Sequence, residues 1–346
     1  MLLCLLSQKG VIKVKKEQSF VSKLTGSRNF GLVVVLMIII CVAAVVTPSI
    51  FMPNTFIGMI QNNAVYGLLA IAEMLVIITG GIDISIGSIL AFVGVVTTRY
   101  MSENMQIPSF VWILVALAVG LLCGMLNGLL VGYLRIVPMI ATLGTMYIFR
   151  GLAFLVSKGQ WWMPHQMTES YQLWATRKIA AIPAIVWILI VCFVIFGVFL
   201  AFTTYGRRIY AIGTSRESSA VAGIKDSVVI FRSMSLCGML AGLAGMLYTA
   251  NYATCVYTIG NSYEMTAIAI CVLGGVSITG GRGRMDGVVI AFILMSFITQ
   301  FISLLPGLSV WSNAIQGAII IGAVGLNFFT IRQAEKRALK ERSELI

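Results

Sequence analysis

Long apolar stretches follow one another along this chain, separated by short polar connections. Ten of them, between Phe30 and Phe329, approach the roughly 20 residues that an α-helix needs to cross a bilayer. The predicted spans are Phe30–Val46, Phe56–Thr79, Ile84–Tyr100, Phe110–Tyr133, Met139–Val156, Ala184–Phe202, Val228–Tyr252, Met265–Ile278, Val288–Leu305 and Val310–Phe329. The third and eighth fit least well, so the pattern allows nine to eleven. It predicts an all-α polytopic membrane protein with about ten transmembrane helices.

The composition agrees with a chain that has little room for a soluble domain. Hydrophobic residues make up 59% of it and charged residues 10%, whereas about a quarter of a soluble domain is charged. We therefore expect a polar N-terminal tail over residues 1–29, one transmembrane domain over residues 30–330 and a polar C-terminal tail over residues 331–346.

The basic residues predict an orientation. If the N-terminus is cytoplasmic, all but five of the 24 Lys and Arg residues fall on the cytoplasmic side. The exceptions are Arg99, Arg150, Lys158, Arg177 and Lys178. This alternation follows the positive-inside rule and places both termini in the cytoplasm, with the protein in the cytoplasmic (inner) membrane. A basic face for anionic lipid would explain the net charge of +12 but not the alternation, and nothing in the charge indicates nucleic acid.

The longest connection on the other side, Ser157–Pro183, is rich in aromatic residues. It contains Trp161, Trp162, Tyr171 and Trp174. Such side chains are typical of a membrane–water interface, which we take as the favoured interpretation. Contact with an external partner or a sugar is the alternative.

A row of glycines marks the fourth predicted span. Gly120, Gly124, Gly128 and Gly132 recur every four residues, so they share one face of the helix. Without side chains there, a neighbouring helix can approach closely. We expect this face to be a helix-packing surface, with Asn127 beside it forming a hydrogen bond to another helix.

Few polar residues interrupt the spans, and four of them are candidates for a translocation pathway. They are Glu73, Asp83, Ser85 and Asn127. An ionisable residue inside a membrane domain is a functional candidate by default. The segment Gly80–Ser88 also has a structural interpretation, because Asp and Ser can cap the helix that follows. The sequence leaves both interpretations open.

Two glycine-rich segments resemble each other. Gly80–Gly87 and Gly274–Gly281 each follow one apolar stretch and precede another. Duplicated halves with interrupted helices are common in transporters, so the chain is a candidate for internally repeated halves. Chance similarity between glycine-rich turns is the alternative.

The connection at residues 203–228 is the most informative segment for function. Thr214 and Glu217 have the spacing of a capping box, with Thr214 as the N-cap, and Gly223 then ends the helix. A helix lying on lipid would need larger apolar residues, so we favour docking to another protein. The residues expected to couple to that partner are Arg207, Thr214, Glu217, Ala220, Val221, Gly223 and Ile224.

Motifs for enzyme chemistry are absent from the sequence. There is no GxxxxGK[ST] P-loop and no HExxH. We find no Cys–His, Ser–His or paired-carboxylate constellation, so the sequence predicts no catalytic residue, no metal ligand and no cofactor. A conduit of this kind would take its energy from another protein.

Four motifs in order resemble the permeases of ribose-type ABC monosaccharide importers, a family that includes ribose, xylose, arabinose, galactose, rhamnose and autoinducer-2 permeases. They are Gly80–Ser88, Pro138–Thr145, Gly206–Gly213 with Ala222–Ile224, and Glu264–Gly275 with Gly280–Gly283. Together they cover roughly residues 54–327. The family often has Gly-Gly-Asn where this chain has Gly213–Ser215, and Ala-Ala where it has Ser219 and Ala220.

The resemblance implies a function and a set of partners. The chain would be the permease subunit that translocates a monosaccharide or small polyol. It would act with ATP-binding cassette subunits, an extracytoplasmic sugar-binding protein and a second permease subunit in a homo- or heterodimer, with residues 203–228 as the coupling segment. The sugar stays open. The alternative is an ion-coupled secondary transporter that acts alone and needs Glu73 or Asp83 as its ion site.

Overall fold

The structure is a computed structural model that describes residues 48–304 continuously and a few single positions on either side. The first and tenth predicted spans, and both predicted tails, lie outside this continuous range. The elements are η1 (Pro48–Phe51), α3 (Pro53–Ile77), α4 (Ile86–Glu103), α5 (Ser109–Gly128), η2 (Leu129–Tyr133), α6 (Pro138–Ser157), η3 (Pro164–Gln166), α7 (Glu169–Thr176), β1 (Lys178–Ile179), β2 (Ile182–Pro183), α8 (Ala184–Phe202), α9 (Thr204–Thr214), α10 (Arg216–Val221), α11 (Asp226–Tyr252), α12 (Tyr263–Leu273) and α13 (Met285–Leu304).

Within these residues, six helices are long and apolar enough to cross a membrane: α3, α5 extended by η2, α6, α8, α11 and α13. The chain is therefore an all-α polytopic membrane protein, and the bounds of α8 coincide with the sixth predicted span. The prediction of a complete eighth span is wrong. Its helix, α12, has 11 residues and rises only about 16 Å. It ends at Gly274 and Gly275, and Gly275 has a φ of +77°.

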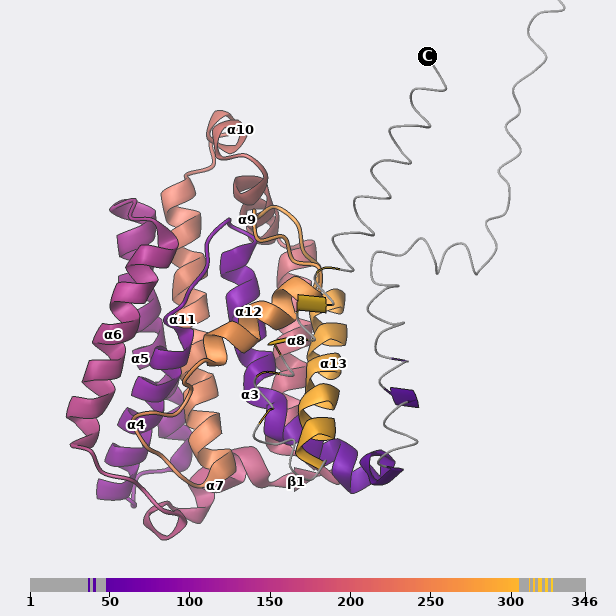
Figure 1. Ribbon diagram of the computed structural model, residues 1–346. Helices are drawn as coiled ribbons and strands as arrows, with labels where there is room; N and C mark the ends of the chain where they lie inside the picture. Colours follow the sequence, from indigo (N-terminus) through magenta and orange to yellow (C-terminus); the bar gives the residue numbers. More distant parts are fainter. Residues whose placement is uncertain are drawn as a thin grey trace, which may run out of the picture.

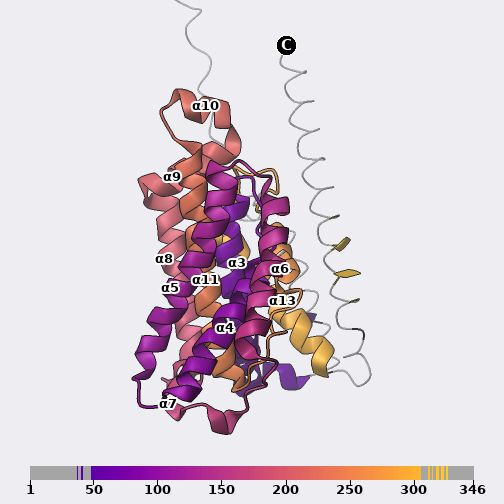
Figure 2. The ribbon, with the colours of Figure 1, turned by 90° about the vertical axis from the view of Figure 1, so that its left-hand side faces the viewer.

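The bundle is built around α3 and α11 (Figures 1 and 2). The most apolar windows of these helices are 78% and 67% buried, against 28% for α5, α6 and α8. The outer three helices therefore present broad apolar faces to lipid or to a partner. Both views place α10 at one end of the bundle and α7 at the other. The bundle thus has two distinct ends, joined by the interior helices.

The glycine face of α5 packs against α11. A Cβ atom at Gly120 would lie 2.8 Å from the Cα of Gly242, and one at Gly124 would lie 3.0 Å from the Cα of Gly238. The face continues toward the α10 end, where Gly128 meets the backbone of Phe231. Glycines on both helices therefore let the two backbones approach more closely than any side chain would permit.

The segment between α6 and α8 covers the end of the bundle opposite α10. Two of its aromatic residues are interior rather than interfacial, contrary to the favoured interpretation of the sequence. Trp162 is 2% exposed and exchanges backbone hydrogen bonds with Cys255. Tyr171 is fully buried, its hydroxyl 2.7 Å from that of Thr249. Burial raises the pKa of Tyr171 to about 12, because the phenolate form would lose its hydration. These residues anchor the segment to the core.

Candidate functional site

The four residues predicted as pathway candidates meet in one hydrogen-bonded cluster, which we call the Asp83 cluster. Ser85 donates to Asp83 Oδ1 through its backbone N–H at 2.8 Å and its hydroxyl at 2.6 Å. From α5, Asn127 Nδ2 donates to Asp83 Oδ2 at 3.2 Å and to Ser85 Oγ at 2.7 Å. On α3, Glu73 Oε1 accepts the backbone N–H of Asp83 at 3.0 Å. All four residues are fully buried.

The Asp83 cluster has unused hydrogen-bonding capacity. Glu73 Oε2 and Asn127 Oδ1 are buried and find no hydrogen-bond partner in the described part of the chain. A buried polar atom left in this state is costly and calls for a functional or structural reason. Because all four residues are fully buried, the cluster is closed in this conformation, and it holds two oxygen atoms without a partner among the described residues.

The connection from α3 to α4 folds back into the bundle and positions Asp83. It turns at Gly80, whose φ is +82°, a conformation that glycine adopts without strain. Ile84 then donates its backbone N–H to Thr142 Oγ1 on α6 at 3.1 Å. Backbone hydrogen bonds from Asp83 to Glu73 and from Ile84 to Thr142 therefore act together with the side-chain bonds of Asp83 and Ser85 to hold this connection in place.

The two similar glycine-rich segments contact each other. The α12–α13 connection lies against the α3–α4 connection, and Gly281 donates its backbone N–H to Ile78 O at 2.9 Å. Gly280 has a φ of +86°, and a Cβ atom on it would lie 2.9 Å from the nitrogen of Gly80. The segments that resemble each other in sequence thus form one glycine junction in space.

The end of α9 packs directly on this glycine junction. A side chain at Gly213 would collide with the carbonyl oxygen of Ile78 and the nitrogen of Gly281. Nearby, the hydroxyl of Tyr210 donates to Gly283 O at 2.9 Å. Sequence reasoning missed α9, although its buried residues Ile209 and Ile212 have the three-residue spacing of a helix face. Helix α9 therefore links the surface of the protein to the α3–α4 connection and to the α12–α13 connection.

The structure corrects the predicted capping of α10. Ser215, not Thr214, is the N-cap, and its Oγ accepts the backbone N–H of Ser218 at 3.2 Å. Thr214 instead ends α9, and its hydroxyl donates to Tyr210 O. The prediction failed because α9 extends through Thr214. Glu217 is consequently the second residue of α10, and it is exposed.

The end of α10 follows the prediction for Gly223. Its φ is +76°, and backbone hydrogen bonds run from Gly223 to Ala220 and from Ile224 to Ser219, which is a Schellman motif. Val221 is 91% exposed and Ala220 is also exposed. Ile224 is half-buried and packs against the core. The exposed apolar surface of α10 is therefore smaller than predicted and centres on Val221.

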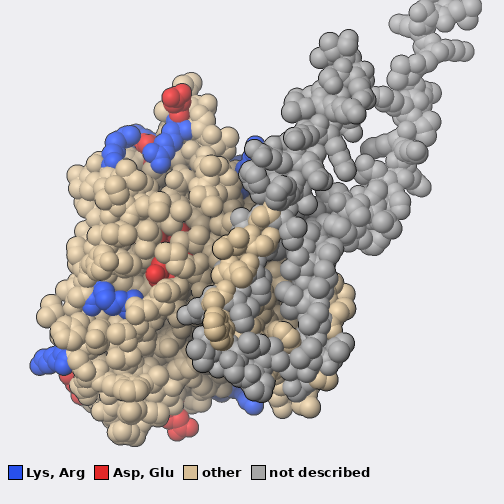
Figure 3. All heavy atoms as spheres, in the orientation of Figure 1, with Lys and Arg blue, Asp and Glu red and all other residues tan. Residues whose placement is uncertain are grey.

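Basic side chains gather at this end of the molecule, on the face drawn in Figure 3. Arg207, on the first turn of α9, is exposed and donates to Phe202 O at 3.3 Å. The other basic residues of the nearby connections and helix ends are Arg135, Arg208, Arg216, Lys225, Arg232, Arg282 and Arg284. Only two acidic residues pair with them in the described part of the chain: Asp226 with Arg135, and Asp286 with Arg284. This end is suited to an acidic partner or to anionic headgroups.

Sequence reasoning also missed a structural cation inside α6. Arg150 lies within α6, and its Nη1 donates to Tyr257 O at 2.9 Å and to Ile259 O at 2.7 Å. It therefore holds the connection that leads into α12. Glu264 lies at the start of α12, is 8% exposed, and its carboxylate contacts Gly87 near the N-terminus of α4. A charged residue within an apolar span was the available signal.

Comparison with known proteins identifies the kind of protein to which this architecture belongs. A family model described as the permease component of branched-chain amino acid transport systems matches residues 54–324. The chain belongs to this permease family. The match spans every helix from α3 to α13 except the first residue of α3, so the Asp83 cluster, the glycine junction and α10 are all parts of the permease domain.

Curated relatives carry more specific names. The ribose import permease protein RbsC of Escherichia coli (strain K12) is 32% identical over 294 residues, which are 84% of this chain and 91% of the relative. RbsC of Bacillus subtilis (strain 168) is 33% identical over 292 residues, 84% and 90% of the two chains. The autoinducer 2 import system permease protein LsrC of Yersinia pseudotuberculosis (serotype O:3) is 32% identical over 281 residues, 81% and 79% of the two chains. No solved structure matches. The relatives confirm the resemblance to ribose-type sugar permeases.

Proposed function

We propose that the chain is the membrane-spanning permease subunit of an ABC importer that moves a monosaccharide or a similar small polyol across the cytoplasmic membrane. The observation that carries this proposal is the similarity to ribose and autoinducer 2 import permeases over more than four fifths of the chain. The description of the family model names branched-chain amino acid transport, but the names of the relatives favour a sugar as the transported solute. The chain is a transport subunit and not an enzyme.

The partners follow from this role. ATP-binding cassette subunits dock at the α10 end, which lies in the cytoplasm together with both termini. An extracytoplasmic sugar-binding protein delivers the solute at the α7 end, and a second permease subunit completes the pathway. Exposed Val221 on a short capped helix supports α10 as the docking element, because a small apolar surface ringed by arginines fits a groove on an acidic or mixed protein surface.

The contacts within the chain provide a route from the docked ATPase to the interior. A displacement of α10 moves α9 through the single residue between them, Ser215. Because Gly213 packs on the backbone of Ile78 and Gly281, α9 cannot move without moving the α3–α4 and α12–α13 connections. The first of these carries Asp83 and Ser85. ATP binding therefore opens or closes the Asp83 cluster through contacts between rigid elements.

A secondary transporter that works alone is the alternative, and the buried Glu73 and Asp83 are the observation in its favour. The two proposals differ in their requirement for a partner. Solute uptake into vesicles that contain only this chain and an ion gradient would support the alternative. Uptake that needs ATP and co-purifying ATP-binding subunits supports the importer.

The sharpest test is Val221→Asp in the assembled transporter. An unpaired carboxylate in a buried contact is strongly unfavourable, so subunit association, solute import and solute-stimulated ATP hydrolysis should fall together. The membrane fold should persist, because the side chain of Val221 is almost fully exposed. Val221→Ile is the matched control, since it keeps an apolar surface, and it should retain association and import.

Two outcomes of these experiments would contradict the proposal. If Val221→Asp imports solute at the normal rate with full subunit association, then α10 is not the docking element. If neither the native chain nor its variants ever associate with an ATP-binding subunit, then the importer assignment itself fails.

A further inference from the structure

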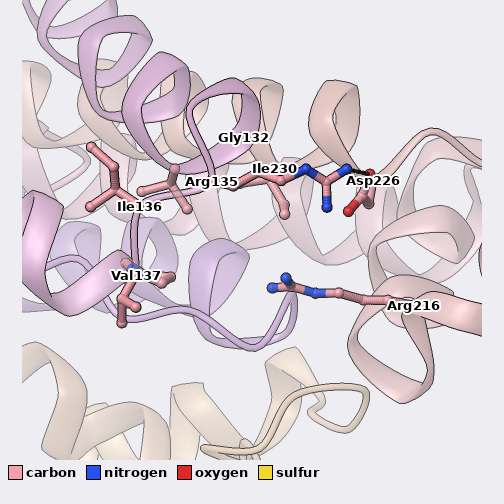
Figure 4. A pocket seen from close by; sticks show the side chains of 9 residues that line it. Gly132, Arg135, Ile136, Val137, Arg216, Asp226 and Ile230 are labelled. Atoms are coloured by element: carbon pink, nitrogen blue, oxygen red, sulfur yellow. Dashed lines mark hydrogen bonds and ion pairs between the residues drawn. The ribbon is translucent and has the colours of Figure 1, made fainter.

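A cavity of about 160 Å³ lies at the α10 end, between the turn from α5 to α6 and the first residues of α10 and α11. We call it the α10-end pocket. Two arginines and one aspartate line it together with apolar residues (Figure 4). Arg135 forms an ion pair with Asp226 at 3.4 Å. The remaining guanidinium, that of Arg216, has no ion-pair or hydrogen-bond partner among the residues that the structure describes.

In the α10-end pocket, one positive charge has no negatively charged partner among the described residues. In Figure 4 the Arg216 side chain reaches from α10 across the pocket toward the α5–α6 turn. The pairing of Arg135 with Asp226 cancels one charge of each sign, so the lining retains a single net positive charge. A planar guanidinium aimed into a cavity is well suited to binding a phosphate or carboxylate through two parallel hydrogen bonds.

The apolar part of the pocket lining favours an amphiphilic anion over a free inorganic anion. Ile136, Val137 and Ile230 line the pocket, and Val137 is 57% exposed. One turn further along α6, Ile140 is 66% exposed. The apolar surface therefore continues from the pocket along α6, whose most apolar window is only 28% buried. A free anion would gain nothing from this surface, whereas an amphiphile could place its head in the pocket and an acyl chain along α6.

We propose that the α10-end pocket binds an anionic phospholipid with one phosphodiester charge, such as phosphatidylglycerol. Arg216 holds the phosphate, and the exposed apolar residues of the α5–α6 turn and α6 contact the acyl chain. Since Arg216 is the first residue of α10, a bound lipid would fix the docking helix relative to the membrane. The proposal rests on the membrane position of this end and not on which solute is imported.

The test uses the purified full-length chain in a neutral detergent and follows its thermal unfolding. Short-chain phosphatidylglycerol should raise the Tm of the native chain more than phosphatidylcholine or inorganic phosphate does. Removing a hydrogen bond to a charged group commonly weakens binding roughly tenfold or more, so Arg216→Gln should need that much more phosphatidylglycerol for the same increase. The phosphatidylglycerol concentration that Arg216→Lys needs should lie between those of the native chain and Arg216→Gln, because lysine keeps the charge but cannot form the two parallel hydrogen bonds of a guanidinium.

Two further variants keep the test specific. Lys178→Gln removes an exposed basic residue of β1 at the opposite end of the bundle (Figure 1), and its response to phosphatidylglycerol should equal that of the native chain. Val137→Glu places a carboxylate at the exposed rim of the pocket and should weaken the response as Arg216→Gln does. A weakened response in both pocket variants, with an unchanged response in the Lys178 variant, would support the lipid site; if one pocket variant is poorly expressed, the other carries the comparison with the control.

Two results would overturn the proposal. Arg216→Gln could respond to phosphatidylglycerol as the native chain does; if it also lost association with the ATP-binding subunits, the pocket would be assigned to a protein partner. Phosphatidylcholine or inorganic phosphate could match phosphatidylglycerol, which would exclude recognition of an anionic lipid. Both results are measurable without transport, so they do not depend on the identity of the solute.

Discussion

Gly124 on α5 permits a direct test of the close contact between α5 and α11. Replacing it with alanine adds one methyl group where the structure has no room. That atom would collide with the carbonyl oxygen of Met234 and would lie 3.0 Å from both the nitrogen and the Cα of Gly238. All three obstacles are backbone atoms of α11. They cannot rotate away as a flexible side chain could, so the two helices must separate.

The size of the effect follows from a matched substitution. Gly151 lies within α6, and a Cβ atom there would meet nothing within 4 Å. Both Gly124→Ala and Gly151→Ala gain helix propensity, worth up to ~1 kcal/mol. This gain cancels in the difference between the variants. What remains is the overpacking of Gly124, about 1–3 kcal/mol. Gly151→Ala should therefore be neutral or stabilising, and Gly124→Ala should be destabilising.

The measurement is thermal unfolding of the full-length chain in detergent, together with the yield of monodisperse protein. Gly124→Ala should unfold at a lower temperature than Gly151→Ala by several degrees, and Gly124→Leu should lower both the Tm and the yield further. Equal Tm values for the two alanine variants would refute the close approach of α5 and α11. So would a normal yield for Gly124→Leu.

Two other substitutions address the route from α9 to the interior. Gly213→Ala would push α9 off the glycine junction, where the obstacles are backbone atoms as they are at Gly124, so the Tm should fall and import per assembled complex should fall while basal ATP hydrolysis persists; unchanged import per complex would show that this contact does not transmit motion. Asp83→Asn would turn an amide donor toward the donor of Asn127, so import should fall roughly tenfold or more with the membrane fold retained, whereas Ser88→Ala, which loses only a local bond to Ser85 O, should import normally.

The membrane fold is the part that local sequence predicts well. In lipid each helix must satisfy its own backbone hydrogen bonds, so apolar length translates almost directly into helices. The predicted and observed bounds of α8 agree, as do those of α11 to within two residues. The prediction was wrong for α12, because the short predicted span Met265–Ile278 is interrupted at Gly274 and Gly275, where Gly275 adopts a φ of +77°. It also missed α9, which is amphipathic rather than apolar.

In the candidate site, too, some features are predictable from local sequence and others depend on how the helices pack. A four-residue glycine spacing is a local signal, and it correctly places Gly120 to Gly132 on one face. Polar residues inside spans are also visible in the sequence, which is why Glu73 and Asn127 could be named. That Asp83 meets Asn127, 44 residues away, is not a local property, because it depends on how α5 packs against the rest of the bundle.

The sequence by itself determined that the chain crosses the membrane many times and which permease family its motifs resemble, whereas the orientation that its basic residues favour stays a prediction. Apolar length, charge and glycine spacing are local quantities, and the bilayer acts on each of them separately. Only the tertiary structure decided that Gly213 lies on Ile78 and Gly281, that α12 stops short of spanning, and that Arg216 faces a pocket. These features arise from the fit between surfaces distant in the chain, where close approach at one contact fixes the position of the next.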